Sequence, residues 1–253
     1  MSEGTGTCLR ERGRRGLTWI GVVVSVMLLI TAMPIERFYQ SYWHRLRAMP
    51  AMVTARETRT GGRWTPLRDI SHWVPEALIA TEDRTFYSNL GISFEGIGRS
   101  VLVDLNSGQL QQGGSTLTQQ LVRNMLLSSV KTFRRKVSEA LLATLMTTLY
   151  SKREILTLYL NEVYLGDGAY GIFSASERYF GVAPRQLTLP EAALIAGLPQ
   201  APTAYDPKLH WLAAKNRQWQ VLESMVADHV ISLSEAHRIY RAPLPLKKVS
   251  RKS

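Results

Sequence analysis

The chain has 253 residues, a length that suits one domain with additional segments or two small domains. Hydrophobic residues make up 45% of the chain, which is enough for a buried core, and the formal net charge is +11 at pH 7. A basic excess of this size favours an anionic partner, such as nucleic acid, anionic lipid or a phosphate-bearing substrate. The single cysteine, Cys8, excludes an intrachain disulfide.

The N-terminal region predicts a membrane anchor. Residues 1–16 are polar and basic, and residues 17–33 contain no charged side chain. A run of this length is at the short end of the roughly 17–25 residues of a membrane span. A cleaved signal peptide is the alternative, but residues 31–34 form a poor small-residue cleavage site, so we favour an uncleaved signal anchor. Arginines on both sides make the charge bias weak, and we expect the N-terminus inside and the bulk of the chain outside.

This reading divides the chain into five segments. We expect a cytoplasmic basic tail over 1–16, a transmembrane anchor over 17–34, a stalk and entry segment over 35–70, a folded domain over 71–245 and a basic tail over 246–253.

Helix signals dominate the folded domain, and strand signals are sparse. A helix begins near Pro75, another extends from Ser93 to about Asn106, and a Gly-rich loop covers 109–114. Ser115 or Thr116 caps the next helix, whose apolar positions are Leu117, Leu121 and Met125. The fold class is therefore mainly α.

Further helices follow in the second half of the chain. The segment from Thr132 to Tyr150 is predicted to be a helix that buries Val137, Leu141, Leu145 and Leu149. Capping boxes open helices at 151–154, 188–191 and 232–235, and residues 208–229 form another helix.

The segment 77–91 is the first candidate for chemistry. An apolar helical turn leads directly into Glu82, Asp83 and Arg84, and Phe86 and Tyr87 follow. In such partial solvation a carboxylate pKa can move toward neutrality, which suits a general base. A helix end with a solvated acidic pair is the alternative interpretation.

The segment 113–124 is the second candidate. A glycine pair precedes a helix N-terminus, where free backbone N–H groups suit a phosphate. More polar side chains follow than a cap requires, although a well-capped surface helix would also explain some of them: Ser115, Thr116, Thr118, Gln119 and Gln120.

The segment 131–139 is the third candidate. Arg135 and Lys136 lie four and three residues before Glu139, so the three side chains share a helix face. An ordinary solvated face explains such charges, and a cationic wall for a diphosphate is the functional alternative. No histidine or cysteine spacing indicates a metal site.

A fourth block, 152–161, is followed by Gly-rich and aromatic segments up to Gly181. Its apolar residues are typical of a core, and Asn161 and the glycines are expected to shape a turn.

Together these blocks resemble the family 51 glycosyltransferases, the peptidoglycan polymerase module of class A penicillin-binding proteins and of monofunctional transglycosylases. The resemblance extends from about Trp73 to Pro207 and consists of five ordered blocks. It implies a lysozyme-like, two-lobed helical domain with a membrane-facing smaller lobe. These blocks leave no room for a penicillin-binding transpeptidase domain, so the chain is expected to be monofunctional.

The resemblance also implies roles. Glu82 matches the general base that deprotonates the acceptor 4-hydroxyl, and Glu139 matches the second carboxylate. One departure is Asn89, where the family usually has His; Asn cannot titrate near neutrality. The substrate-binding positions implied are Asp83, Arg84, Phe86, Asn89, Gly114, Ser115, Thr116, Gln119, Gln120, Arg123, Asn124, Lys131, Arg135 and Lys136.

The implied partners are lipid II, the growing glycan strand, membrane lipid and other cell-wall synthesis proteins, with no nucleic acid. The implied location is the bacterial inner membrane, with the catalytic domain on the periplasmic face. No cofactor is required, and a loosely bound Mg²⁺ is compatible with the sequence. Two alternatives stay open: a lytic transglycosylase or lysozyme-like hydrolase, which would not need the cations, and a catalytically impaired scaffold, which Asn89 alone favours.

Overall fold

The computed structural model describes residues 37–93, 95, 114–128, 130 and 132–247. The predicted anchor, most of the predicted helix from Ser93 and loop 109–113 lie outside these residues. The chain divides into two compact units, the first ending at Leu46 and the second beginning at Arg47. Within the described residues, no helix is both long and apolar enough to cross a membrane.

The described part of the second unit is helical, which confirms the mainly α fold class, and an isolated bridge between Tyr164 and Tyr170 is the only β pairing recorded there. Its α-helices are α2 (Met49–Arg59), α3 (Trp73–Glu82), α5 (Leu117–Leu126), α6 (Phe133–Leu149), α7 (Lys152–Glu162), α8 (Gly171–Tyr179), α9 (Leu189–Gly197), α10 (Trp211–Ala227) and α11 (Leu233–Arg241). Three short 3-10 helices are η1 (Leu67–Asp69), η2 (Pro184–Gln186) and η3 (Leu198–Gln200).

Side-chain caps determine where several helices begin. Ser151 and Ser232 each form the capping box that the sequence predicts, in which the cap and a glutamate three residues later bond reciprocally. At the third predicted box, the N–H and the hydroxyl of Thr188 both donate to Glu191 Oε2. Thr116 caps α5 in the same way with Gln119, and Thr132 caps α6 through the Arg135 backbone N–H. These local bonds satisfy backbone donors that a helix start leaves free.

Helix α6 buries a different face from the one predicted. The expected core positions Val137, Leu141, Leu145 and Leu149 are half-buried or exposed, with Val137 43% exposed. The buried positions are Glu139, Leu142, Ala143 and Met146, at spacings of three and four residues. The prediction was wrong because it considered only the apolar residues of the helix, whereas two cations pair with Glu139 and compensate its burial.

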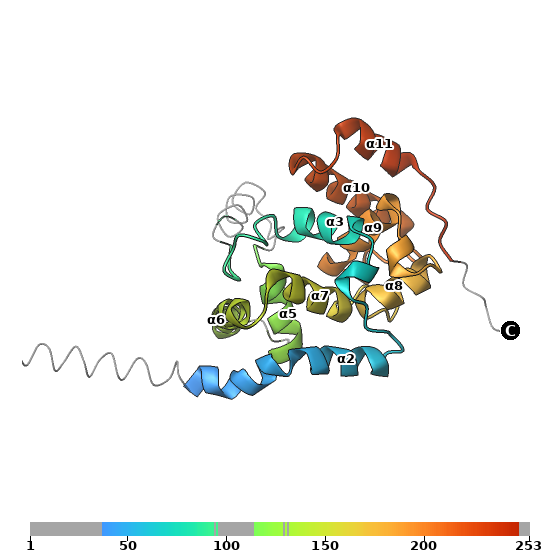
Figure 1. The fold of residues 1–253 in the computed structure, drawn as a ribbon. Helices are drawn as coiled ribbons and strands as arrows, with labels where there is room; N and C mark the ends of the chain where they lie inside the picture. The colour runs from blue at the N-terminus through green and yellow to red at the C-terminus, as the bar shows by residue number, and fades with distance from the viewer. Residues whose placement is uncertain (1–36, 94, 96–113, 129, 131, 248–253) are drawn as a thin grey trace, which may run out of the picture. The chain divides into compact units, whose positions relative to one another are not determined.

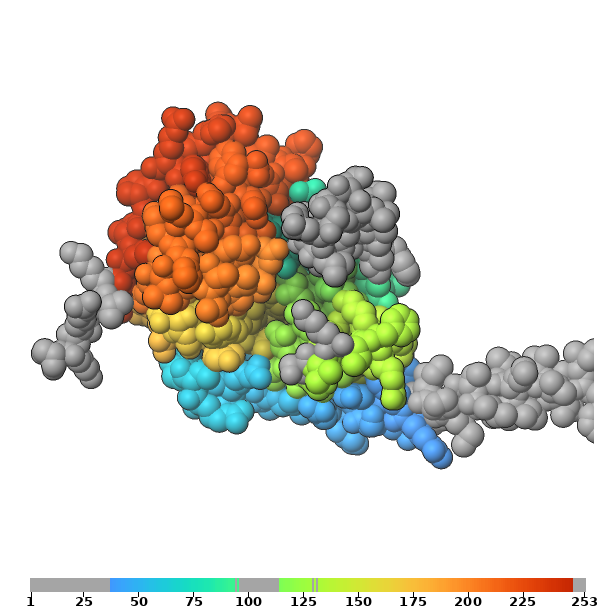
Figure 2. All heavy atoms as spheres, turned by 180° about the vertical axis from the view of Figure 1, so that it is seen from behind, coloured from blue at the N-terminus to red at the C-terminus, as the bar shows by residue number. Residues whose placement is uncertain are grey.

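The helices of the second unit pack in two main groups (Figure 1). Helix α3 packs on α9 and α10, and α10 also packs on α11. In the other group α5 packs on α6 and α7, and α7 packs on α2 and α8. Figure 2 shows the orange-to-red segments of the first group lying together. The green segment of α5 and α6 lies beside the yellow segment of the same second group (Figure 2).

Helix α2 belongs to this packing and not to a free stalk. It packs along α7, and its Met49 and Val53 are fully buried. The stalk expected over 35–70 therefore differs from the structure in its second half, because the apolar face of α2 needs a partner helix to exclude water.

Candidate active site

Glu82, the last residue of α3, lies where the two groups of helices meet. Its Oε2 accepts a hydrogen bond from Gln120 Nε2 at 2.9 Å, and Gln120 belongs to α5 in the other group. Its Oε1 accepts from Arg217 Nη2 of α10 at 3.2 Å. The side chains of Glu82 and Arg217 are 14% and 11% exposed, so the pair is largely withdrawn from water.

Further bonds fix both partners of Glu82. Gln120 Oε1 accepts from the hydroxyl of Tyr159, which is fully buried on α7, and burial raises the Tyr159 pKa well above its usual value. Arg217 Nε donates to the Gly197 carbonyl at 3.2 Å. The Glu82 carboxylate therefore has a defined orientation, which a general base requires.

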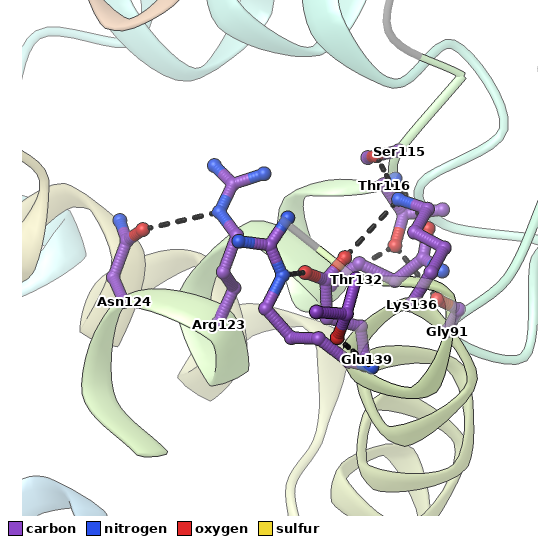
Figure 3. A network of polar contacts seen from close by, with 10 residues as sticks. Gly91, Ser115, Thr116, Arg123, Asn124, Thr132, Lys136 and Glu139 are labelled. Atoms are coloured by element: carbon purple, nitrogen blue, oxygen red, sulfur yellow. Dashed lines mark hydrogen bonds and ion pairs between the residues drawn. The ribbon is translucent and has the colours of Figure 1, made fainter. Parts of the chain in front are cut away.

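A second carboxylate, Glu139, lies on α6 among cations (Figure 3). It is fully buried, and its Oε1 lies 2.9 Å from Arg135 Nε and its Oε2 lies 3.1 Å from Lys136 Nζ. Lys136 also donates to Ser115 Oγ, directly before α5. The i, i+3 and i, i+4 spacings predicted this contact correctly.

The segment 114–120 connects the two carboxylates. Gln120 bonds Glu82 directly, and Ser115 accepts from the lysine that pairs with Glu139. Gly114 lies immediately before this segment and is half-buried. Thr116 caps α5 and also donates to the Gly91 carbonyl at 2.7 Å, while Gln119 completes its capping box (Figure 3). Both side chains are buried and serve the backbone, so a supporting role is favoured for them.

Several residues of the segment 77–91 that were predicted to bind substrate are buried in the protein or paired with other residues. Asp83 is buried, and its Oδ2 accepts from the backbone N–H of Leu117, the first residue of α5. Phe86 is fully buried. Arg84 is exposed and pairs with Asp228 at 3.0 Å, next to the end of α10. These positions favour support of the fold over contact with substrate.

Asn89, the departure from the family pattern, is also buried. Its Nδ2 donates to Asp83 Oδ1 at 2.9 Å, and its Oδ1 accepts from Lys152 Nζ at 3.0 Å. Burial raises the Asp83 pKa and lowers the Lys152 pKa, so both groups depend on such bonds to stay charged.

The remaining predicted residues are Arg123, Asn124 and Lys131. Arg123 Nε donates to Asn124 Oδ1 at 3.4 Å (Figure 3), and Asn124 Nδ2 donates to Glu162 at 3.2 Å. Lys131 lies outside the described residues. Within the described residues, no group of three or more His, Cys, Asp or Glu side chains could hold a metal ion.

Sequence reasoning missed Arg217, the cation that contacts Glu82 across 135 positions of the chain. One signal was present: Arg217 lies on the stripe of α10 that carries the buried Ala214 and Val221. A charge on the buried face of an amphipathic helix indicates a buried partner.

The family profile described as "Transglycosylase" matches residues 50–226. Penicillin-binding protein 1A of Neisseria lactamica is 38% identical over 227 residues, which cover 87% of this chain and 28% of the relative. The protein of the same name from Aquifex aeolicus is 42% identical over 179 residues, 71% of this chain and 25% of the relative.

A crystal structure of penicillin-binding protein 1A from Haemophilus influenzae is also similar, with 24% identity, a TM-score of 0.43 and coverage of 74% of this chain and 18% of that one. The chain spans less than a third of the length of these proteins, and the expectation of a monofunctional enzyme stays a prediction. On the profile match, the chain belongs to the transglycosylase family, the family 51 glycosyltransferases that its motifs resemble.

Proposed function

We propose that the protein is a peptidoglycan glycosyltransferase that polymerises lipid II into β-1,4-linked glycan strands. The proton of the acceptor 4-hydroxyl passes to the Glu82 carboxylate as the hydroxyl oxygen attacks the anomeric carbon of the donor. The bond from that carbon to the diphosphate oxygen breaks, and polyprenyl diphosphate leaves with the electron pair. Attack opposite to the leaving group inverts the anomeric centre.

The observation that carries this proposal is the setting of Glu82. A carboxylate oxygen has two lone-pair directions, and each oxygen of Glu82 accepts one hydrogen bond in the structure. Each oxygen therefore keeps capacity for a proton while Gln120 and Arg217 fix its position. An oriented base in a partly dry site contributes about 10²–10⁴-fold to rate.

The cluster around Glu139 suits the leaving diphosphate. Arg135 and Lys136 are held on one face of α6 by the buried carboxylate, so their charges are fixed before substrate arrives. Fixed cations stabilise charge that develops on a leaving group without reorganising. Arg123 and Lys131 complete the proposed cationic wall, and no step requires a metal ion.

The proposal includes location and partners. The substrate carries a lipid, so we place the enzyme at the bacterial inner membrane, with residues 71–245 as the catalytic domain on the outer face. The net charge of +11 suits an anionic membrane surface and an anionic substrate. Lipid II, the growing strand, membrane lipid and other wall-building proteins are the proposed partners.

The test compares wild type with Glu82→Gln. Detergent-solubilised protein is incubated with labelled lipid-linked disaccharide-pentapeptide, and the products are separated on a gel. We expect long strands from wild type and a loss of about 10²-fold or more in Glu82→Gln, with substrate binding retained, because the amide preserves shape but cannot take the proton.

Glu76→Gln is the matched control, because Glu76 lies in the first turn of the same helix α3. It should polymerise at the wild-type rate. Turnover above a few per cent of wild type in Glu82→Gln would refute the base assignment, and soluble muropeptides released from intact wall would identify a hydrolase or lyase instead.

A further inference from the structure

A pocket of about 480 Å³ lies between α10 and α11, and no residue of the five motif blocks lines it. The pocket is an open depression in the surface, and its volume falls in the range of roughly 300–1,000 Å³ of small-molecule sites. Its lining consists of three aromatic side chains and three polar ones: Trp219, His237, Tyr240, Asn216, Gln220 and Glu223.

The aromatic side chains form a fixed apolar surface. The Trp219 ring centroid lies 5.0 Å from that of His237 and 5.3 Å from that of Tyr240. Lys215 donates to the Tyr240 carbonyl and lies over its ring, 4.2 Å from the centroid. Such stacking attaches α11 to α10, and this structural role accounts for the rings but not for the polar side chains beside them.

The polar side chains lie on one face of α10 with Trp219. Positions 216, 219, 220 and 223 follow the i, i+3, i+4, i+7 pattern of a helix stripe. Asn216 and Glu223 are exposed, and their side chains make no hydrogen bond or ion pair to the described part of the chain. Their amide and carboxylate groups are therefore available to a ligand.

This lining selects a ligand class. Glu223 is the one charged side chain among the six, which disfavours a phosphate or another anion. An amide both donates and accepts hydrogen bonds, and a carboxylate accepts from hydroxyl groups. A pyranose ring has a C–H face for the aromatic surface and hydroxyl edges for these groups, whereas a hydrocarbon would leave them unused.

The pocket is connected to the proposed base. Gln220 Oε1 accepts from Arg217 Nη1 at 3.0 Å, and Arg217 Nη2 lies 3.2 Å from Glu82 Oε1. One guanidinium therefore contacts both the pocket wall and the carboxylate, which places a ligand of the pocket near the reacting sugars.

We propose that the pocket between α10 and α11 is a glycan-binding subsite that holds a neutral sugar residue of the strand. Trp219 supplies the stacking surface, and Asn216 and Glu223 bind the hydroxyl groups. The assignment of that sugar to the growing strand rests on the proposed function, whereas the binding itself does not.

The test measures binding of the β-1,4-linked tetramer of N-acetylglucosamine to the full chain in detergent by calorimetry. The Glu82→Gln background prevents turnover. We expect binding that weakens at least about tenfold in Glu223→Ala and in Asn216→Ala. Both side chains are exposed, so neither variant should lower the unfolding temperature by more than a degree or two. Glu177→Ala, on α8 and with a side chain that is 42% exposed, is the control and should bind normally.

The outcomes separate the two proposals. If the tetramer does not bind, or binds equally to all variants, the pocket is not a glycan subsite, whatever the polymerisation assay shows. If the tetramer binds through Glu223 but wild type makes no strands, the subsite stands and the proposed polymerase fails. The double variant Asn216→Ala Glu223→Ala is also made in the chain that keeps native Glu82. If this variant makes shorter strands than wild type, the growing strand binds in the pocket.

Discussion

Asn89 connects three segments through one neutral amide. Its Oδ1 accepts from Lys152 Nζ and from the Gly91 backbone N–H, and its Nδ2 donates to Asp83. Asp83 in turn accepts from the first N–H of α5. The side chain thus bonds both a buried carboxylate, that of the residue after Glu82, and an ammonium, and it uses its donor and its acceptor at the same time.

Asn89→His tests this arrangement, because the family usually has His here. Neutral imidazole offers one donor and one acceptor, but imidazolium has no acceptor for Lys152. We expect near wild-type kcat/KM at about pH 8 and a several-fold loss below about pH 6.5, the usual pKa of His. The pH profiles of the two proteins check this.

Asn89→Ala is the companion variant and should lose activity at every pH, because it removes the bonds to Lys152, Gly91 and Asp83. If Asn89→His and wild type have the same profile from about pH 5.5 to 8, Asn89 only fills space and does not support the site.

At this scale local spacing predicted much of the candidate site. Arg135, Lys136 and Glu139 meet because they lie within two turns of one helix. Arg217 could not be placed in the same way, because its contact with Glu82 depends on how α10 packs on α3. Burial of Phe86 and Asp83 likewise depends on the tertiary structure.

At the scale of elements, the capped helix starts were predictable and the buried faces less so. Thr132 and Ser151 determine where α6 and α7 begin through bonds within four residues. The orientation of α6 follows from its packing on α5, which sequence spacing does not specify. Because Glu139 pairs with two cations, it can then occupy a core position that a polarity pattern assigns to the surface.

The carboxyl group of Glu57 is buried where α2 meets α8, and its pKa differs from the usual value. Glu57 is 1% exposed, and within the described residues neither carboxylate oxygen has a hydrogen-bond partner. A Cβ on Gly171, the first residue of α8, would lie only 2.8 Å from Glu57 Oε1, which shows how closely the two helices approach. Burial raises the Glu57 pKa from 4.5 to about 7.

Glu57→Gln should therefore stabilise the protein at alkaline pH. Between pH 4.5 and about 7 the folded chain keeps a proton that the unfolded chain has lost, so the unfolding free energy falls as pH rises. Above about pH 7 wild type has the full cost, at most about 3 kcal/mol at about 1.4 kcal/mol per pKa unit. The unfolding temperatures of wild type and variant at about pH 5 and about pH 8 check this.

The amide variant should unfold several degrees higher than wild type near pH 8 and at a similar temperature near pH 5. Glu177→Gln, at a position whose side chain is 42% exposed, should match wild type at both values. An equal gain at both pH values would show that the effect comes from packing and not from the proton.

At the scale of the whole molecule, the site is assembled from distant segments. Glu82, Gln120, Glu139 and Arg217 come from α3, α5, α6 and α10. The order of the motif blocks predicted the family, but not which elements touch, because the sequence alone does not place helices that are far apart in the chain. The bond between Glu82 and Gln120 shows why the two packed groups must be positioned together.

The proposed anchor over 17–34 predicts how the whole chain attaches to the membrane. A transmembrane run should keep the full chain in the membrane fraction in about 1 M NaCl, where the Debye length is only about 3 Å and surface attraction is screened. Placing Val24→Arg and Leu28→Arg together in the run costs about 2.5–3.5 kcal/mol each for insertion, so this variant should appear in the salt wash. Val24→Ile with Leu28→Ile keeps the run apolar and should stay with the membrane. Release of wild type by salt would mean that the +11 charge alone attaches the protein, and a mature mass lacking the N-terminal residues would show a cleaved signal.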